Sequence, residues 1–181
     1  MSNIKLNEES FTKLKHPVLK YPWRSSLNIV EHLKPFIENK IVCDIGCACG
    51  DLLYELKDFC KDVIGVESNK YYLENLKNFN IDRGFIVWDN IFNVEIPKAE
   101  VYFLWLSGNL KINERVINKI PLDSIIIDST SKINMFKEYK NLELLGVYNY
   151  ELDETIYFDS RFSGTNFKPK DTRIFRVYKK I

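Results

Sequence analysis

Three carboxylates are the residues of this chain best suited to bind a ligand. Asp44, Glu67 and Asp89 each end a short apolar run, and they stand 23 and 22 residues apart. Strands of an open α/β sheet bind ligands in the crevice outside their carboxyl ends, where these side chains are expected. Ionised carboxylates accept hydrogen bonds only, so they suit hydroxyl-rich groups such as ribose. The spacing therefore predicts a nucleotide-like ligand lying across three strand ends.

A glycine-containing turn follows the first of these acids. The segment Lys40–Asp51 reads K-I-V-C-D-I-G-C-A-C-G-D and runs from an apolar strand into an amphipathic helix. Gly46 and Gly50 allow a tight turn and a close approach of the backbone to a ligand. The start of the next helix offers free N–H groups to the same ligand. The first acid and this turn together predict a strand–loop–helix unit that binds a nucleotide.

The other two acids have separate expected partners. Glu67 follows the apolar run Val63–Val66 and is placed to accept hydrogen bonds from ribose hydroxyls. Asp89 and Asn90 follow Phe85–Trp88 and offer an acceptor and an amide donor, which suit an adenine edge. These pairs predict a ligand with a ribose and an adenine.

These residues resemble the class I, or seven-β-strand, S-adenosylmethionine-dependent methyltransferases. Asp44, Gly46 and Gly50 match the first motif of that family, Glu67 the second and Asp89 the third, over roughly half of the chain. The resemblance implies a methyltransferase that uses S-adenosylmethionine. It places the cofactor on ten residues: Asp44, Gly46, Cys47, Ala48, Gly50, Glu67, Ser68, Asp89, Asn90 and Leu106.

The turn departs from the family pattern at one position. Ala48 stands where the middle glycine of the first motif is usual, which adds one methyl group to the loop. The nicotinamide alternative is weaker, because the turn lacks the G-x-G-x-x-G spacing of dinucleotide folds. A binding module without transfer activity and an aminopropyl transferase remain open alternatives.

The methyl acceptor is indicated less clearly. The fourth apolar run, Val101–Leu106, is followed by S-G-N-L, which fits neither the base-amine nor the RNA ribose methyltransferases. The segment Ala99–Leu110 has a weaker resemblance to archaeal and mitochondrial lysine methyltransferases of this fold, with Trp105 and Asn109 at the matching positions. We therefore expect a protein lysine or other amine as acceptor, with a small molecule or RNA as alternatives.

Two further segments are candidates for the acceptor pocket. The aromatic segment Tyr21–Arg24 lies before the first helix, and it makes Trp23, with Asn109, a candidate catalytic residue. The basic and aromatic segment Arg161–Lys170 is the second candidate surface. Methyl transfer needs alignment and exclusion of water more than a general base, so the lack of an obvious base does not argue against catalysis.

The pattern of apolar residues predicts a doubly wound, Rossmann-like α/β fold. We expect a three-layer sandwich with a mostly parallel seven-stranded sheet and an antiparallel C-terminal hairpin, formed by residues 25–181 after an arm of residues 1–24. A helix carrying Leu27, Ile29, Val30 and Leu33 is expected to begin at Ser25 or Ser26 and to end or kink at Pro35. The expected strands are Ile41–Cys43, Val63–Val66, Phe85–Trp88, Val101–Leu106, Ser124–Ile127, Leu142–Tyr150, Thr155–Phe158 and Arg173–Tyr178. Helices are expected after Asp51 and Glu67, over Lys111–Ile120 and over Met135–Lys140.

Composition narrows the cellular context. The net charge is +1, and no stretch resembles a signal peptide or an apolar membrane span, so we expect a cytoplasmic protein with no membrane partner. Of four cysteines, Cys43, Cys47 and Cys49 lie close together, but their spacing fits neither zinc nor a radical-type iron–sulfur motif. We expect reduced thiols and no metal. The oligomeric state is open.

Overall fold

The computed structural model describes residues 3–4, 28–48, 50–68, 85–88, 93, 95–104, 110–129, 139–151 and 172–181. The expected boundary between arm and domain at residue 24 lies outside these residues. So do the expected helix after Glu67, most of the helix over residues 135–140, and the strand Thr155–Phe158.

One sheet of eight strands organises the described residues, in the order β1-β4-β3-β2-β5-β6-β8-β7. The strands are β1 (Asn3–Ile4), β2 (Ile41–Ile45), β3 (Asp62–Glu67), β4 (Phe85–Trp88), β5 (Val101–Leu104), β6 (Ile125–Asp128), β7 (Leu142–Glu151) and β8 (Thr172–Lys180). Strands β2 to β6 are parallel to their neighbours among themselves, whereas β8 pairs antiparallel with both β6 and β7. The doubly wound, mostly parallel sheet with an antiparallel C-terminal hairpin is thus confirmed.

The strand β1 corrects the expected count of seven and the expectation that the first residues are irregular. It pairs antiparallel with β4, with Asn3 opposite Val87 and Ile4 opposite Ile86. A strand of two residues is too short to show the alternation of apolar and polar residues by which strands are found in a sequence. The partner strand, not the local pattern, therefore determines this strand.

The strand order places a switch point in the middle of the sheet. From β2 the chain adds β3 and then β4 on one side, and it then returns to place β5 on the other side of β2. A crevice forms at the carboxyl ends of the two strands where the winding direction reverses, and ligands of doubly wound sheets bind there. The fold thus places a ligand crevice beside the ends of β2 and β5.

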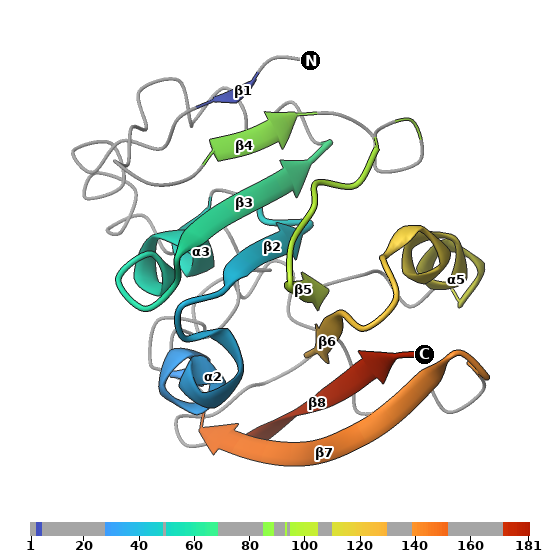
Figure 1. Ribbon diagram of the computed structural model, residues 1–181. Helices are drawn as coiled ribbons and strands as arrows, with labels where there is room; N and C mark the ends of the chain where they lie inside the picture. Colours follow the sequence, from blue (N-terminus) through green and yellow to red (C-terminus); the bar gives the residue numbers. More distant parts are fainter. Residues whose placement is uncertain are drawn as a thin grey trace, which may run out of the picture.

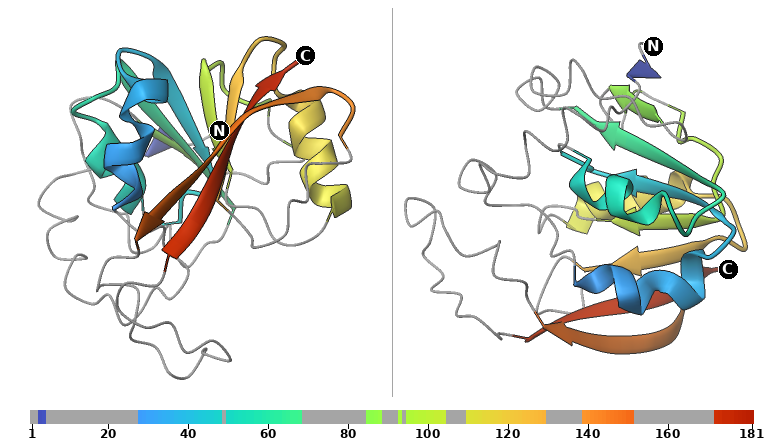
Figure 2. Two further views of the ribbon diagram at one scale, coloured as in Figure 1. Left: turned by 90° about the horizontal axis from the view of Figure 1, so that it is seen from below. Right: turned by 90° about the vertical axis from the view of Figure 1, so that its left-hand side faces the viewer.

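Helices cover both faces of the sheet. The helices α2 (Ile29–Ile37) and α3 (Asp51–Leu56) lie on one face, and α5 (Leu110–Lys119) lies on the other (Figures 1 and 2). This is the expected three-layer sandwich. None of the helices in the described part of the chain is long and apolar enough to cross a bilayer.

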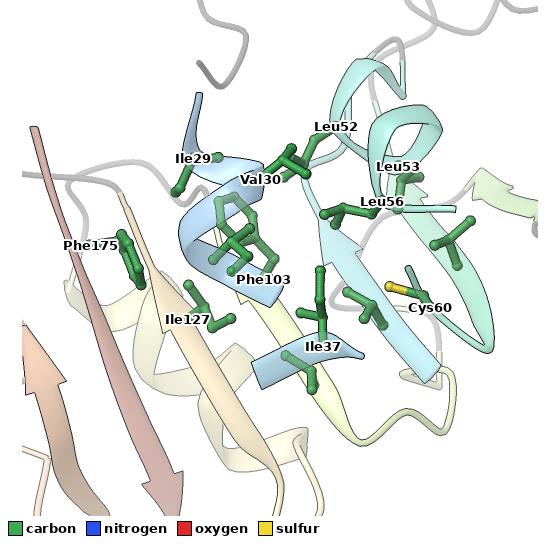
Figure 3. Close-up of a cluster of buried hydrophobic side chains, with 14 of the residues drawn as sticks. Ile29, Val30, Ile37, Leu52, Leu53, Leu56, Cys60, Phe103, Ile127 and Phe175 are labelled. Carbon is green, nitrogen blue, oxygen red and sulfur yellow. The ribbon is translucent and has the colours of Figure 1, made fainter. Parts of the chain in front are cut away.

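The core consists of two clusters, one on each side of the sheet. Alternate residues of the central strand β5 enter opposite clusters: Val101 and Phe103 pack toward α2 and α3, whereas Tyr102 and Leu104 pack toward α5. Figure 3 shows the first cluster, in which side chains of α2 and α3 meet Phe103 of the central strand β5. Both faces of the parallel strands are buried, which explains why their sequences are apolar without alternation.

Helix α2 continues through Pro35, contrary to the expectation that the helix ends or kinks there. It runs on to Ile37, which is fully buried, as are Ile29 and Leu33. The proline ring removes one backbone hydrogen bond and costs about 3 kcal/mol in a helix interior. Each buried Ile or Leu returns about 1.5–3 kcal/mol, so the apolar stripe outweighs the proline. The described helix begins after Asn28, which makes no side-chain capping bond, and both serines lie outside the described residues.

Several strands extend beyond their expected ends, and β2 and β6 do so at acidic residues. Strand β2 reaches Ile45, so Asp44 lies within the strand, opposite Gly65 on one side and Phe103 on the other. Strand β6 ends at Asp128, which pairs with Leu104 and Arg176. Because β2 and β6 are each hydrogen-bonded to a neighbouring strand on both sides, each continues beyond the apolar run that predicts it.

Replacing Phe103 with alanine should lower the free energy of unfolding by about 3–5 kcal/mol, because a large side chain at the centre of the core would leave a cavity. Phe103 is 1% exposed. Denaturant titration measures the change. The control Leu122→Ala, at a side chain 69% exposed, should change the free energy of unfolding by less than about 0.5 kcal/mol. Equal effects of the two substitutions would contradict this account of the core.

Candidate functional site

The loop between β2 and α3 forms the centre of the candidate site. Gly46 and Gly50 have φ angles of 86° and 79°, in the left-handed region that only glycine adopts without strain. The N–H of Gly46 donates to the carbonyl of Val66 at 2.8 Å, and the N–H of Gly50 donates to the carbonyl of Cys47 at 2.8 Å. The loop is therefore tightly turned and is attached to the end of β3, as its glycines predict.

Glu67 ties this loop to the neighbouring strand. Its Oε2 accepts a hydrogen bond from the N–H of Ala48 at 2.9 Å, and its Oε1 accepts one from the N–H of Ser68 at 2.8 Å. A carboxylate has about four acceptor positions in all. The two backbone bonds fix the direction of this carboxylate at the end of β3.

Asp44 is the most perturbed acid of the site. It is 3% exposed, and the described residues provide no hydrogen-bond partner for its Oδ1. Burial, and secondarily the nearby charge of Glu67, raises the pKa of Asp44 to about 8. A buried carboxylate beside a second acid is stabilised by a proton or by a positively charged group. Asp44 is therefore suited to contact a cationic part of a ligand.

The described cysteines near the loop form no disulfide. Cys43, Cys47 and Cys60 are buried, and burial raises the pKa of Cys60 to about 12. In the described ranges, no three His, Cys, Asp or Glu side chains lie close enough together to hold a metal ion. These cysteines pack as small apolar side chains.

The structure brings together seven of the predicted site residues: Asp44, Gly46, Cys47, Ala48, Gly50, Glu67 and Ser68. They lie next to one another at the ends of β2 and β3, and this group of residues is called here the cofactor cradle, after the ligand expected from the sequence. Five predicted site residues lie outside the described residues: Trp23, Asp89, Asn90, Leu106 and Asn109. The segments Tyr21–Arg24 and Arg161–Lys170 and the residue Trp105 also lie outside them.

Sequence reasoning missed four polar residues at the same edge of the sheet. Asp128, Ser129 and Arg176 belong to the β6–β8 half of the sheet, and Asn113 lies in the first turn of α5; all are buried. Asp128 follows the apolar run Ile125–Ile127 as the other acids follow theirs, so the strand-end rule could have found it. Asn113 could have been found as a polar residue in an otherwise apolar helical stripe.

Comparisons with known proteins found methyltransferases that are similar in sequence and in structure. No family model matches the chain. The probable cobalt-precorrin-6B C(15)-methyltransferase (decarboxylating) of Methanococcus vannielii is 26% identical over 117 residues, which cover 58% of this chain and 63% of the relative. The match therefore spans less than two thirds of that curated protein.

Solved structures show the fold. The precorrin-6y C5,15-methyltransferase of Geobacter metallireducens superposes with a TM-score of 0.54 at 16% identity, covering 85% of this chain and 87% of that one. The M. jannaschii TYW2 structure, solved in complex with AdoMet, has a TM-score of 0.54 at 14% identity and covers 87% of this chain and 78% of that one. The chain thus has the fold of the class I S-adenosylmethionine-dependent methyltransferases.

The raised pKa of Asp44 predicts a pH-dependent stability. The pKa of about 8 in the folded chain exceeds the ordinary aspartate value of 3.8, so the folded chain holds a proton that the unfolded chain releases. This contribution to stability is complete below about pH 4 and is lost as the pH rises through about 8. Denaturant titrations at pH 5 and pH 8 should therefore show a smaller loss of stability on raising the pH for Asp44→Asn than for the wild type. The control Asp58→Asn, whose side chain is 72% exposed, should keep the wild-type loss. Equal losses of stability in all three proteins would refute the raised pKa of Asp44.

Ala48 adopts a φ angle of 48°, where an L side chain costs about 1–2 kcal/mol and glycine does not. We expect Ala48→Gly to keep the fold and to leave the free energy of unfolding unchanged or raised by up to about 1 kcal/mol. Thermal unfolding measures the change. A clear loss of stability would mean that the methyl group contributes packing that outweighs its strain.

Proposed function

We propose that this chain is a methyltransferase that uses S-adenosylmethionine. The observation that carries the proposal is the cofactor cradle, in which a left-handed glycine loop is hydrogen-bonded to a strand-end glutamate beside a buried aspartate. The cradle lies at the switch point of a sheet with the methyltransferase fold, where nucleotide-like ligands bind. Similarity to methyltransferases in sequence and in structure supports the same proposal.

The residues of the cradle fit the chemical groups of this cofactor. Glu67, whose carboxylate is fixed at the end of β3, is suited to accept hydrogen bonds from ribose hydroxyls. The unpartnered Oδ1 of Asp44 suits the ammonium group of the methionine moiety, which would take the place of the proton that Asp44 otherwise holds. Asp89 and Asn90 are proposed to contact the adenine, and Leu106 to line the same cleft.

The chemistry supplied by the bound cofactor is an activated methyl group on a sulfonium. The chain itself has to hold the cofactor, orient the acceptor and exclude water. Glu67 and the loop fix the nucleoside end, and Asp44 fixes the methionine end. Trp23 and Asn109 are proposed to align the acceptor from the N-terminal arm and from the turn after β5.

The acceptor we propose is a tetrapyrrole-derived small molecule. Supporting this choice, the relative found by sequence is named for methylation at C(15) of cobalt-precorrin-6B. A structural neighbour is likewise named for a precorrin. No protein compared above is named for a lysine acceptor, so the expectation of protein lysine lacks support. Under this proposal, the binding partner of the chain is its methyl acceptor.

Removing the carboxylate of Glu67 should weaken S-adenosylmethionine binding about tenfold or more, because a hydrogen bond to a charged acceptor contributes about 1.5–3 kcal/mol. Isothermal titration calorimetry of Glu67→Ala measures the affinity. The control Glu143→Ala, at an exposed residue of β7, should bind as the wild type does. Wild-type affinity in Glu67→Ala would refute the ribose assignment.

The acceptor proposal has its own test. The wild-type chain is incubated with methyl-labelled S-adenosylmethionine and with cobalt-precorrin-6B, bulk tRNA or a lysine-rich protein in separate reactions. We expect label in the tetrapyrrole alone. Transfer to another acceptor would overturn the acceptor and keep the enzyme class, and cofactor binding without any transfer would identify a binding module.

A further inference from the structure

Strand β7 forms an open edge of the sheet. It pairs with β8 on one side, and no described strand pairs with its other side (Figure 1). At ten residues it is the longest strand in the described part of the chain, and it contains no proline. The outer N–H and C=O groups of such a strand can form a ladder with a strand of another chain.

Apolar side chains are exposed along this edge. Leu144, Leu145 and Val147 of β7 are all exposed. Two other large apolar side chains are exposed among the described residues, and both lie at this end of the sheet: Leu122 comes just before β6, and Ile181 follows β8. Apolar side chains that gather at one place on a protein surface indicate a contact with another molecule.

A β-bulge determines which side chains of β7 share a face. Leu144 lies opposite Tyr178, and Val147 lies opposite Arg176, so three steps along β7 match two steps along β8. Leu145 is the extra residue of the bulge. Residues two apart on a strand point to the same face. Leu144 and Val147 therefore lie on one face of the sheet although they are three residues apart.

This spacing makes β7 complementary to a second copy of itself. In an antiparallel pair of β7 strands centred on Gly146, Leu144 of each copy lies opposite Val147 of the other. When the ladder continues two residues before β7, Lys140 lies opposite Glu151, the last residue of the strand. Two-fold symmetry makes both the apolar pair and the charge pair occur twice. Cross-strand pairs of these kinds stabilise antiparallel sheets.

We propose that β7 joins two copies of this chain edge to edge, in an antiparallel dimer centred on Gly146. The occupant is a second copy because β7 itself supplies both members of the apolar pair and of the charge pair. Strands β5, β6 and β8 separate β7 from β2 and β3, so the cofactor cradle stays outside this interface. The inference goes beyond the proposed function and does not depend on it.

Sedimentation equilibrium of the full chain, at a series of concentrations, measures the molecular mass and the dissociation constant of the dimer. We expect the wild type to dimerise. Lys140→Glu and Glu151→Lys each replace two attractive pairs with two like-charge pairs, so each should raise the dissociation constant at least tenfold. The double variant Lys140→Glu/Glu151→Lys restores opposite charges at both pairs and should bring the dissociation constant back to within threefold of the wild-type value.

A matched control separates the interface from a general effect of charge. Glu95→Lys makes the same charge change as Glu151→Lys, at an exposed position before β5, and should leave the dissociation constant within twofold of the wild-type value. Thermal unfolding should show that all variants remain folded, because the substitutions avoid the core. A monomeric wild type, single variants that dimerise as the wild type does, or a double variant as weak as the single ones would overturn the proposal.

Discussion

The hydrogen bond from the Ala48 N–H to Glu67 is the interaction on which the candidate site depends. It is 2.9 Å long and joins the glycine loop after β2 to the last residue of β3. Two strands that are neighbours in the sheet are thereby joined at their ends, and the loop is held in a left-handed conformation that would otherwise be strained. The same bond aims the carboxylate of Glu67, so loop shape and ligand recognition are set together.

Asp44 depends on this arrangement as well. The bond holds Glu67 near a buried aspartate, and burial together with the charge of Glu67 disfavours the ionised form of Asp44. A cationic ligand group would relieve that cost. Asn113 and Ser129 repeat the pattern with uncharged groups. The carboxyl edge of the sheet thus carries buried polar side chains that lower the stability of the fold and to which a bound ligand could form hydrogen bonds. Such a loss of stability is common at functional sites.

Local rules explain what the sequence could predict. Glycines and strand-end acids identify the cradle because their effects are confined to a few adjacent residues. By contrast, the pairing of β1, the passage of α2 through Pro35 and the burial of Asn113 depend on neighbours distant in sequence. A strand of two residues is too short to show periodicity. The sequence around Pro35 indicates the energetic cost of a proline in a helix, but it does not indicate the packing that offsets this cost.

A crystal structure of the full chain with S-adenosylhomocysteine tests the central claim most directly. The account predicts both ribose hydroxyls within hydrogen-bonding distance of the Glu67 carboxylate, the ammonium group beside Asp44, and the backbone bond between Ala48 and Glu67 retained. A ligand bound elsewhere on the sheet, or a ribose held by residues other than Glu67, would contradict it.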